Sequence, residues 1–271
     1  MQSFLLGLFL IAALLCPRPA AAVEPICGQY TLAFYELGVL YYRDVDGTAA
    51  GIDKDVVEEL TRRTGCQFNT VVESRVRIWH QMSQQLLDLS VSGIATPERE
   101  KFAHFIPYFQ TRNYALLRLE LSNALPTPQA FLADATRKVG VVKSFKHGSF
   151  YDAWLQRLRE QQRVVELADF ETAVRMFKLG RVDAVLALPT SLIRLLQKEG
   201  LKDRIKVMDW APQERLVHGL IVSRQRVSPA DQQTLRAALA AMQADGSLYR
   251  IFKHHVGKDL AYDMQLTPLP N

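Results

Sequence analysis

Residues 138–188 read KVGVVKSFKHGSFYDAWLQRLREQQRVVELADFETAVRMFKLGRVDAVLAL. Three short apolar runs in this stretch are separated by two longer segments whose apolar residues recur at helical spacing. The pattern predicts strands at 138–142, 163–167 and 182–188, and helices at 149–160 and 170–179. Strands that alternate with helices favour an open, mostly parallel sheet that is covered by helices.

The same alternation continues on both sides of this stretch. We expect further strands at 30–35, 67–72, 89–92, 114–119, 205–208 and 217–222, and further helices at 53–64, 79–87, 191–199, 229–244 and 248–255. Two such α/β series joined by two extended crossings predict two lobes with a cleft between them, a common place for a ligand. The expected division is lobe 1 at 23–115 and 220–271, lobe 2 at 116–219, and a two-strand hinge near 114–119 and 217–222.

The composition is that of a globular protein, with 48% hydrophobic and 23% charged residues among 271. Lys and Arg (33) exceed Asp and Glu (28), and the excess is spread along the chain. A nucleic-acid-binding protein would show a basic stripe and a recognition motif, so no nucleic-acid partner is expected. The mildly basic balance suits attraction to anionic solutes or surfaces.

The N-terminus has the pattern of a secretory signal peptide. Residues 4–15 form an apolar run too short to span a bilayer, and Ala20-Ala21-Ala22 matches a cleavage site before Val23. Cys16 raises the alternative of a lipoprotein anchor, but Leu15 stands where such signals have a small residue. We therefore predict a signal peptide at 1–22 and a periplasmic mature protein without Cys16.

Two cysteines remain after that cleavage, and each lies beside a predicted strand. Cys27 precedes the strand at 30–35, and Cys66 precedes the strand at 67–72. An exported protein meets an oxidising compartment, which favours a disulfide over two free buried thiols.

Four short motifs follow one another along the mature chain. They are Gly51-Ile52-Asp53-Lys54-Asp55, Ser92-Gly93-Ile94-Ala95-Thr96-Pro97-Glu98-Arg99 with Phe105-Ile106-Pro107-Tyr108 after it, Gly180-Arg181-Val182-Asp183-Ala184-Val185, and Asp245-Gly246-Ser247-Leu248. In this order they resemble the motifs of type 3 extracytoplasmic solute-binding proteins, the amino-acid receptors of ABC importers. The resemblance implies the two-lobed periplasmic-binding-protein fold.

The resemblance also implies a set of ligand-binding residues. Arg99 resembles the arginine that holds the ligand carboxylate, a role that a guanidinium fork suits. Asp183 resembles the acid that accepts the α-ammonium group. The remaining candidates are the backbone groups of Ser92 and Ile94, Trp79 as an aromatic wall, Tyr41 in the first ligand loop, and Lys143.

Each candidate has an alternative interpretation. Arg99 would pair with Glu98 or Glu100 if it lay on a solvated face, and Trp79 suits a core position nearly as well. Arg75, Arg77 and Lys143 suit the surface, whereas at the cleft they would favour a dicarboxylate or another anionic ligand.

Three functions remain open. The first is a monomeric periplasmic receptor that closes on a small polar carboxylate-bearing solute, an amino acid or a related anion, and delivers it to an ABC permease. The second is a dehydratase-type enzyme on the same fold, in which Glu36, Glu73 and Asp169 are conceivable catalytic acids. A carboxylic acid with a raised pKa in the cleft would favour this function. The third is a sensory module that docks on a membrane receptor. The six histidines show no metal-binding spacing and no catalytic motif is recognised, so no metal, cofactor or catalytic residue is expected.

Overall fold

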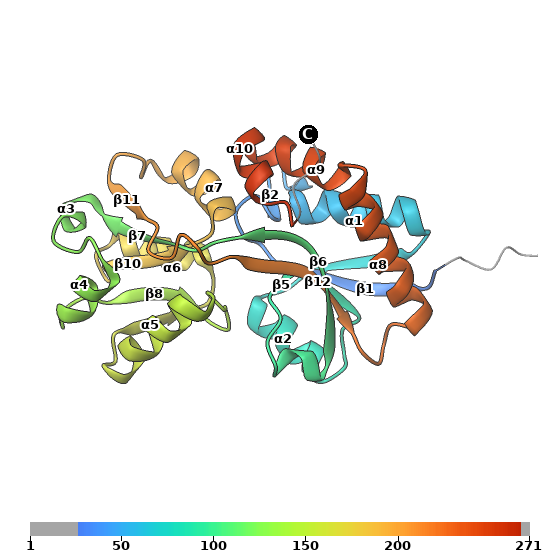
Figure 1. The fold of residues 1–271 in the computed structure, drawn as a ribbon, viewed down its shortest axis with the longest axis horizontal. Helices are drawn as coiled ribbons and strands as arrows, with labels where there is room; N and C mark the ends of the chain where they lie inside the picture. The colour runs from blue at the N-terminus through green and yellow to red at the C-terminus, as the bar shows by residue number, and fades with distance from the viewer. Residues whose placement is uncertain (1–26, 267–271) are drawn as a thin grey trace, which may run out of the picture.

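The computed structural model describes residues 27–266, which form two α/β lobes, each built on its own five-stranded sheet (Figure 1). The predicted signal peptide and Cys16 lie outside the described residues. The expected α/β class with two sheets flanked by helices is confirmed.

In the sheet of lobe 1 three neighbouring strands pair in parallel, and a fourth strand pairs antiparallel with both of its neighbours. Its strands, in spatial order, are β4 (Gln67–Val72), β1 (Gln29–Phe34), β5 (Leu89–Gly93), β12 (Leu216–Ser223) and β6 (Ala103–Thr111). The helices of this lobe are α1 (Ile52–Thr64), α2 (Arg75–Ser83), α8 (Pro229–Ala244), α9 (Ser247–Val256) and α10 (Lys258–Asp263), with a 3-10 turn at Arg99–Lys101. Figure 1 shows α1, α8 and α9 on one face of the sheet and α2 on the other.

The sheet of lobe 2 repeats this plan. Its strands, in spatial order, are β11 (Ile205–Met208), β7 (Tyr114–Arg118), β10 (Ala184–Ala187), β8 (Val139–Val142) and β9 (Val164–Leu167). Its helices are α3 (Leu119–Ser122), α4 (Pro128–Ala133), α5 (Ser149–Glu160), α6 (Phe170–Lys178) and α7 (Pro189–Glu199). The strands β8, β9 and β10 are parallel, whereas β7 runs antiparallel to both of its neighbours.

A small hairpin projects from lobe 1. It pairs β2 (Tyr42–Arg43) with β3 (Ala49–Ala50) across a turn that contains Asp46-Gly47, where Gly47 adopts a φ of 84°.

Several elements differ from the sequence prediction, among them the short helices α3, α4 and α10, which were not expected. Helix α2 begins four residues earlier than expected, because the Ser74 hydroxyl accepts a hydrogen bond from the Arg77 N–H and caps it. Strand β6 was missed. It contains Pro107, which breaks a strand pattern but is tolerated here because β6 lies at the edge of its sheet.

The Cys27–Cys66 disulfide joins the start of β1 to the start of β4. The two Cα atoms lie 4.6 Å apart because these neighbouring strands pair in parallel register from Gln29 and Gln67 onward. The predicted disulfide is therefore present.

The chain crosses between the lobes at two places. Residues 112–113 join β6 to β7, and residues 209–215 join β11 to β12. The expected lobe boundaries stay a prediction, but these crossings set the floor of the space between the two sheets.

Candidate functional site

Two hollows lie between the lobes and meet at Leu37. The larger is an open groove of about 860 Å³ beside α6 and α7. Several charges along this side of the molecule are paired across exposed contacts, such as Arg43 with Glu36 and Arg77 with Glu73. The smaller hollow is a cavity with a different chemistry, and we take it as the candidate site.

Both lobes line the cavity, together with Asn113 from the first crossing. The lining residues are Leu37, Leu40, Arg75, Trp79, Ser92, Ile94, Arg99, Asn113, Ser144, Phe145, Lys146, Leu188 and His218. Its volume of about 40 Å³ has room for only a few water molecules. The lobes are therefore closed on each other, and the side chains of the site fill most of the space that a solute would need.

Arg99 bridges the two lobes. Its guanidinium lies 3.8 Å from the centre of the Trp79 ring and donates to the Ile94 carbonyl of lobe 1 and the Ser144 carbonyl of lobe 2, both at 2.8 Å. Burial, followed by the nearby positive charge of Arg75, lowers the pKa of Arg99 to about 10. The two hydrogen-bond partners of Arg99 are neutral carbonyls, and the acids that act on its charge, Asp152 and Glu98, are not hydrogen-bonded to it among the described residues.

Arg75 is the second guanidinium of the cavity and is only 5% exposed. It donates to the Val91 carbonyl at 3.1 Å and lies 4.6 Å from the centre of the Tyr35 ring. Burial lowers the pKa of this guanidinium. Within the described part of the chain it forms no ion pair, although the nearby Tyr35 and Asp53 partly oppose this lowering of its pKa.

Behind the cavity wall, Asp53 is held in a closed network. Both of its carboxylate oxygens accept from the Ser92 hydroxyl at 2.8 Å, and one also accepts from the Tyr108 hydroxyl. Burial raises the pKa of Asp53 to about 6, although these hydrogen bonds oppose the shift. The Ser92 N–H donates to the Tyr108 hydroxyl as well, so Ser92 and Asp53 satisfy each other rather than a solute.

Two buried polar atoms of the cavity, Trp79 Nε1 and His218 Nε2, have no hydrogen-bond partner among residues 27–266. The Nδ1–H of His218 donates to the Ser92 carbonyl at 3.3 Å, which leaves Nε2 as an acceptor in the neutral ring. Burial lowers the pKa of His218 to about 4, so the ring is neutral at pH 7. Buried polar atoms are almost always hydrogen-bonded, so these two atoms indicate a place for a ligand.

The backbone is strained at the same place. Ser92 and Ser144 have φ of 52° and 66°, in the left-handed region that residues with a side chain rarely adopt. Such strain costs about 1–3 kcal/mol per residue and concentrates at ligand sites. At Ser144 it aims the carbonyl at Arg99.

The structure brings four of the candidate residues to the cavity: Arg99, Trp79, Ser92 and Ile94. It places Tyr41 in the groove, stacked on Phe34 at 4.4 Å. Lys143 is exposed outside the cavity lining, and Lys146 from the same turn takes its place.

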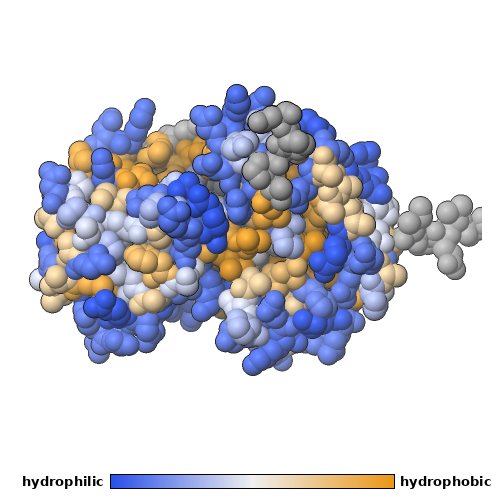
Figure 2. Space-filling view, in the orientation of Figure 1, coloured by the Kyte–Doolittle hydropathy of each residue, from blue (hydrophilic) through white to orange (hydrophobic). Residues whose placement is uncertain are grey.

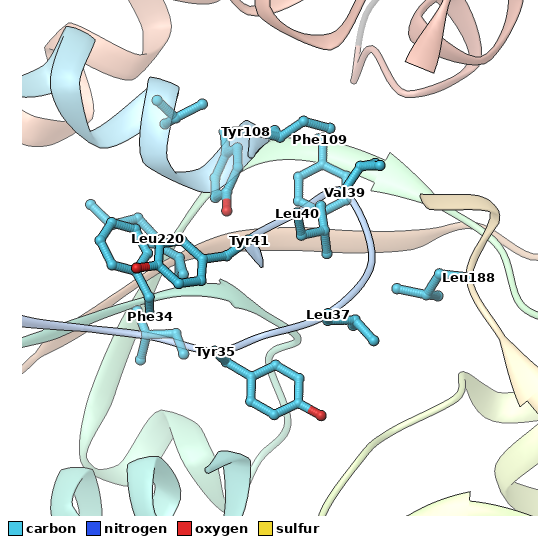
Figure 3. Close-up of a cluster of buried hydrophobic side chains, with 14 of the residues drawn as sticks. Phe34, Tyr35, Leu37, Val39, Leu40, Tyr41, Tyr108, Phe109, Leu188 and Leu220 are labelled. Atoms are coloured by element: carbon cyan, nitrogen blue, oxygen red, sulfur yellow. The ribbon is translucent and has the colours of Figure 1, made fainter. Parts of the chain in front are cut away.

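Asp183 lies at the far end of lobe 2 from the cavity. It precedes β10 and accepts from Arg118 at 3.0 Å, Arg137 at 3.2 Å and the Lys138 N–H at 2.9 Å. The carboxyl end of this strand, where ligands bind in parallel sheets, leads instead to Leu188. Figure 3 shows the Leu188 side chain pointing toward Leu37 of the opposite lobe. Asp183 is accordingly not part of the site that we propose.

His218, Asn113 and Leu188 also line the cavity, although none of them was predicted to do so from the sequence. His218 stands out as a polar residue inside the apolar run 216–222, a signal that was available. Asn113 lies in a crossing segment, where it donates to the His147 carbonyl at 2.9 Å. No sequence pattern marks Leu188, because an apolar residue at the end of a buried strand is ordinary.

Direct contacts also close the lobes beside the cavity. The Val39 N–H donates to the Thr190 carbonyl at 3.0 Å, and the Arg194 guanidinium lies 3.6 Å from the centre of the Tyr42 ring. Gly38 approaches α7 so closely that a Cβ there would lie 2.4 Å from both the Thr190 oxygen and the Ser191 Cα. The space-filling view shows the narrow waist at which the lobes meet, between largely hydrophilic outer surfaces (Figure 2).

Two α/β lobes with a buried polar cavity at their junction define the class of two-lobed solute-binding proteins. The chain belongs to the bacterial extracellular solute-binding proteins of family 3, whose family model matches residues 39–258. A search of the curated proteins finds no match. Within residues 27–266, no helix is long and apolar enough to cross a membrane, and no cluster of three metal-ligating side chains is found.

Solved structures share the fold at low sequence identity. An ancestral arginine-binding protein bound to arginine has a TM-score of 0.72 and 18% identity, with 86% of this chain and 100% of that chain covered. The arginine-, lysine-, histidine-binding protein ArtJ of Geobacillus stearothermophilus has a TM-score of 0.71 and 17% identity, covering 84% and 96%. An ancestral amino-acid-binding protein, a precursor of cyclohexadienyl dehydratase, has a TM-score of 0.68 and 16% identity, covering 84% and 95%.

Proposed function

We propose that this protein is a periplasmic receptor that closes its two lobes around a small carboxylate-bearing solute and delivers it to an ABC importer. The observation that carries the proposal is the place of Arg99. Its guanidinium stands between the lobes on the Trp79 ring, and its hydrogen-bond partners are carbonyls that a carboxylate can replace. A guanidinium fork binds a carboxylate through two parallel hydrogen bonds.

The closed contacts support the proposal. Hinge closure around a ligand is the working motion of binding proteins of this type. Here the lobes already touch through Val39 and Thr190, and Arg99 reaches across to Ser144. A solute that replaces the Ser144 carbonyl as partner of Arg99 would hold both lobes at once.

The enzyme alternative finds less support in the site. Glu36, Glu73 and Asp169 line the open groove rather than the cavity. Asp53 has the raised pKa that a general acid needs, but the Ser92 hydroxyl stands between it and the cavity.

Thermal unfolding of the ligand-stripped mature protein tests the proposal, against a panel of amino acids and small carboxylates. A solute at 100 times its Kd stabilises the folded state by about 2.7 kcal/mol, which raises the Tm by roughly 5–10 °C for a protein of this size. The change Arg99→Ala should cost about 2–5 kcal/mol of binding, roughly 30-fold to several thousandfold in Kd.

The control is Arg157→Ala, an exposed arginine on α5 whose loss should leave the ligand-induced shift unchanged. No shift with any member of the panel, or a full shift in Arg99→Ala, would contradict the proposal. Uptake of the bound solute by vesicles that contain the cognate permease then tests delivery.

A further inference from the structure

The charges that face the cavity all have the same sign. Arg75, Arg99 and Lys146 line it, and none of its lining residues is an aspartate or a glutamate in the part of the chain that the structure describes. His218 is neutral, and the carboxylate of Asp53 is turned to Ser92 and Tyr108 behind the wall. A solute that enters this site therefore contacts two guanidinium groups and no acid of the described lining, while the nearest acids, Asp53, Asp152 and Glu98, act on these guanidinium groups from outside that lining.

Arg75 has no role inside the protein that accounts for its burial. A guanidinium has five N–H donors, and the one hydrogen bond that Arg75 makes to the described residues goes to the Val91 carbonyl. The rings of Tyr35 and Phe145, with centres at 4.6 and 5.9 Å, flank its charge without neutralising it. A buried, unpaired charge is costly, so this arrangement is suited to an anion that arrives with the solute.

In the closed structure the cavity's carbonyl acceptors already accept hydrogen bonds, and any that a solute frees are neutral, so they cannot neutralise an ammonium group as a carboxylate would. The Ile94 and Ser144 carbonyls accept from Arg99, and the Ser92 carbonyl accepts from His218. Asn113 Oδ1 lies 3.4 Å from the His147 ring nitrogen. His218 Nε2 is left over, a neutral acceptor that suits a hydroxyl group.

Strand β10 has an acid next to it in sequence, but the residue that follows the strand and lines the cavity is apolar. Asp183 lies before β10 and is neutralised by Arg118 and Arg137, whereas Leu188, after β10, lines the cavity. On the side of lobe 2 at this strand end, the cavity wall is therefore a hydrocarbon side chain and not an acid.

We propose that the solute is a small organic anion without an ammonium group, a dicarboxylate or hydroxycarboxylate, and that Arg75 binds its second anionic or polar group while Arg99 binds a carboxylate. This inference rests on the proposed receptor function. The unpartnered Trp79 Nε1–H is a further donor for such an acceptor-rich solute, and His218 Nε2 can accept from its hydroxyl. An α-amino acid would instead bury its ammonium group beside two like charges.

Matched sets of solutes that differ only at the α-carbon test this. Isothermal titration of the ligand-stripped protein would compare aspartate with malate and succinate, glutamate with 2-hydroxyglutarate and glutarate, and alanine with lactate and propionate. We expect the amino-free member of the best-bound set to bind at least tenfold more tightly than the amino acid. An amino acid that binds as tightly as its amino-free analogue overturns the inference and leaves the receptor function standing. If no member of any set binds, both proposals fail.

Variants of two residues separate the roles. Arg75→Gln should weaken dicarboxylate binding at least tenfold and monocarboxylate binding much less, whereas Arg99→Ala should weaken both. Leu188→Asp places an acid in the cavity and should weaken anion binding at least tenfold. Leu188→Asn is the control, because asparagine has nearly the same shape as aspartate without its charge, and it should change the ratio of anion affinity to amino-acid affinity little. An unchanged ratio in Leu188→Asp would overturn the inference, even if Arg75→Gln fails to fold.

Discussion

His147 and His218 show how burial, the largest cause of their pKa shifts, keeps a histidine uncharged in this protein. Both side chains are nearly inaccessible, and burial lowers their pKa values to about 3 and about 4. In the unfolded chain a histidine titrates near 6.5. Unfolding in weak acid therefore takes up protons, and the stability present above pH 6.5 is lost as the pH falls toward 4.

The change His218→Gln tests this pH dependence. Between pH 6.5 and 4 the wild type should lose about 3 kcal/mol of unfolding free energy that the variant does not lose. Urea unfolding of both proteins across this range, without ligand, measures the difference. Parallel stability curves would mean that the ring is already charged in the folded protein.

At the same scale, Arg99 and Asp183 show what a motif can and cannot predict. Both were selected by resemblance, and the structure brings only Arg99 to the cavity. The motif around Asp183 correctly indicates a buried acid before a strand, but the end of the strand that faces the other lobe depends on strand direction in the assembled sheet. The role of Arg99 as a carboxylate ligand stays a prediction.

At the scale of elements, the disulfide shows how strand pairing acts on chain entropy. Cys27 and Cys66 are 39 residues apart in sequence, yet the parallel pairing of β1 and β4 brings them together. In the chain-entropy account, closing a loop of this length stabilises the fold by about 3–4 kcal/mol.

Replacing both cysteines, Cys27→Ser with Cys66→Ser, should remove that stabilisation. Urea unfolding would measure it as a lower midpoint, with a slope at least as steep as that of the wild type because the unfolded chain is less compact without the disulfide. Wild type treated with a reductant under unfolding conditions should match the double variant. Equal midpoints for the oxidised wild type and the variant would contradict this prediction. They would show that the pairing of β1 with β4 stabilises this edge of the sheet without a contribution from the disulfide.

Element types were mostly predictable, and element ends were less so. The alternating pattern in 138–188 predicted β8, α5, β9, α6 and β10 because each is a short apolar run or an amphipathic segment. The start of helix α2 and the whole of strand β6 were not predicted, for local reasons. The Ser74 side chain caps α2 earlier than expected, and β6 contains a proline that is tolerated at the sheet edge. A sequence pattern carries the period of an element, whereas its ends depend on which polar groups satisfy the backbone there.

At the scale of the whole molecule, closure depends on a single glycine. Gly38, at a φ of 55°, lies against the backbone at the start of α7, and any side chain there would collide with it. Because the collision occurs between lobes, it should open the molecule and leave each lobe folded.

We expect Gly38→Ala to weaken solute binding about tenfold or more, because the apparent affinity falls with the population of the closed state. The control is Gly47→Ala, which has a similar positive φ of 84° but no atom within 4 Å of the added Cβ. Small-angle scattering should show a larger radius of gyration for the first variant only. Equal affinities for the two variants would contradict this role of Gly38.

The sequence by itself determined the α/β class, the order of most strands and helices, the disulfide and the family. These follow from local patterns of apolar residues, turn residues and short motifs. The tertiary structure alone decided which residues meet at the cavity, because Arg75, Ser144, Leu188 and His218 come from four distant segments. It also left two guanidinium groups without an acid between the lobes, since charge compensation depends on distances in space and not on positions along the chain.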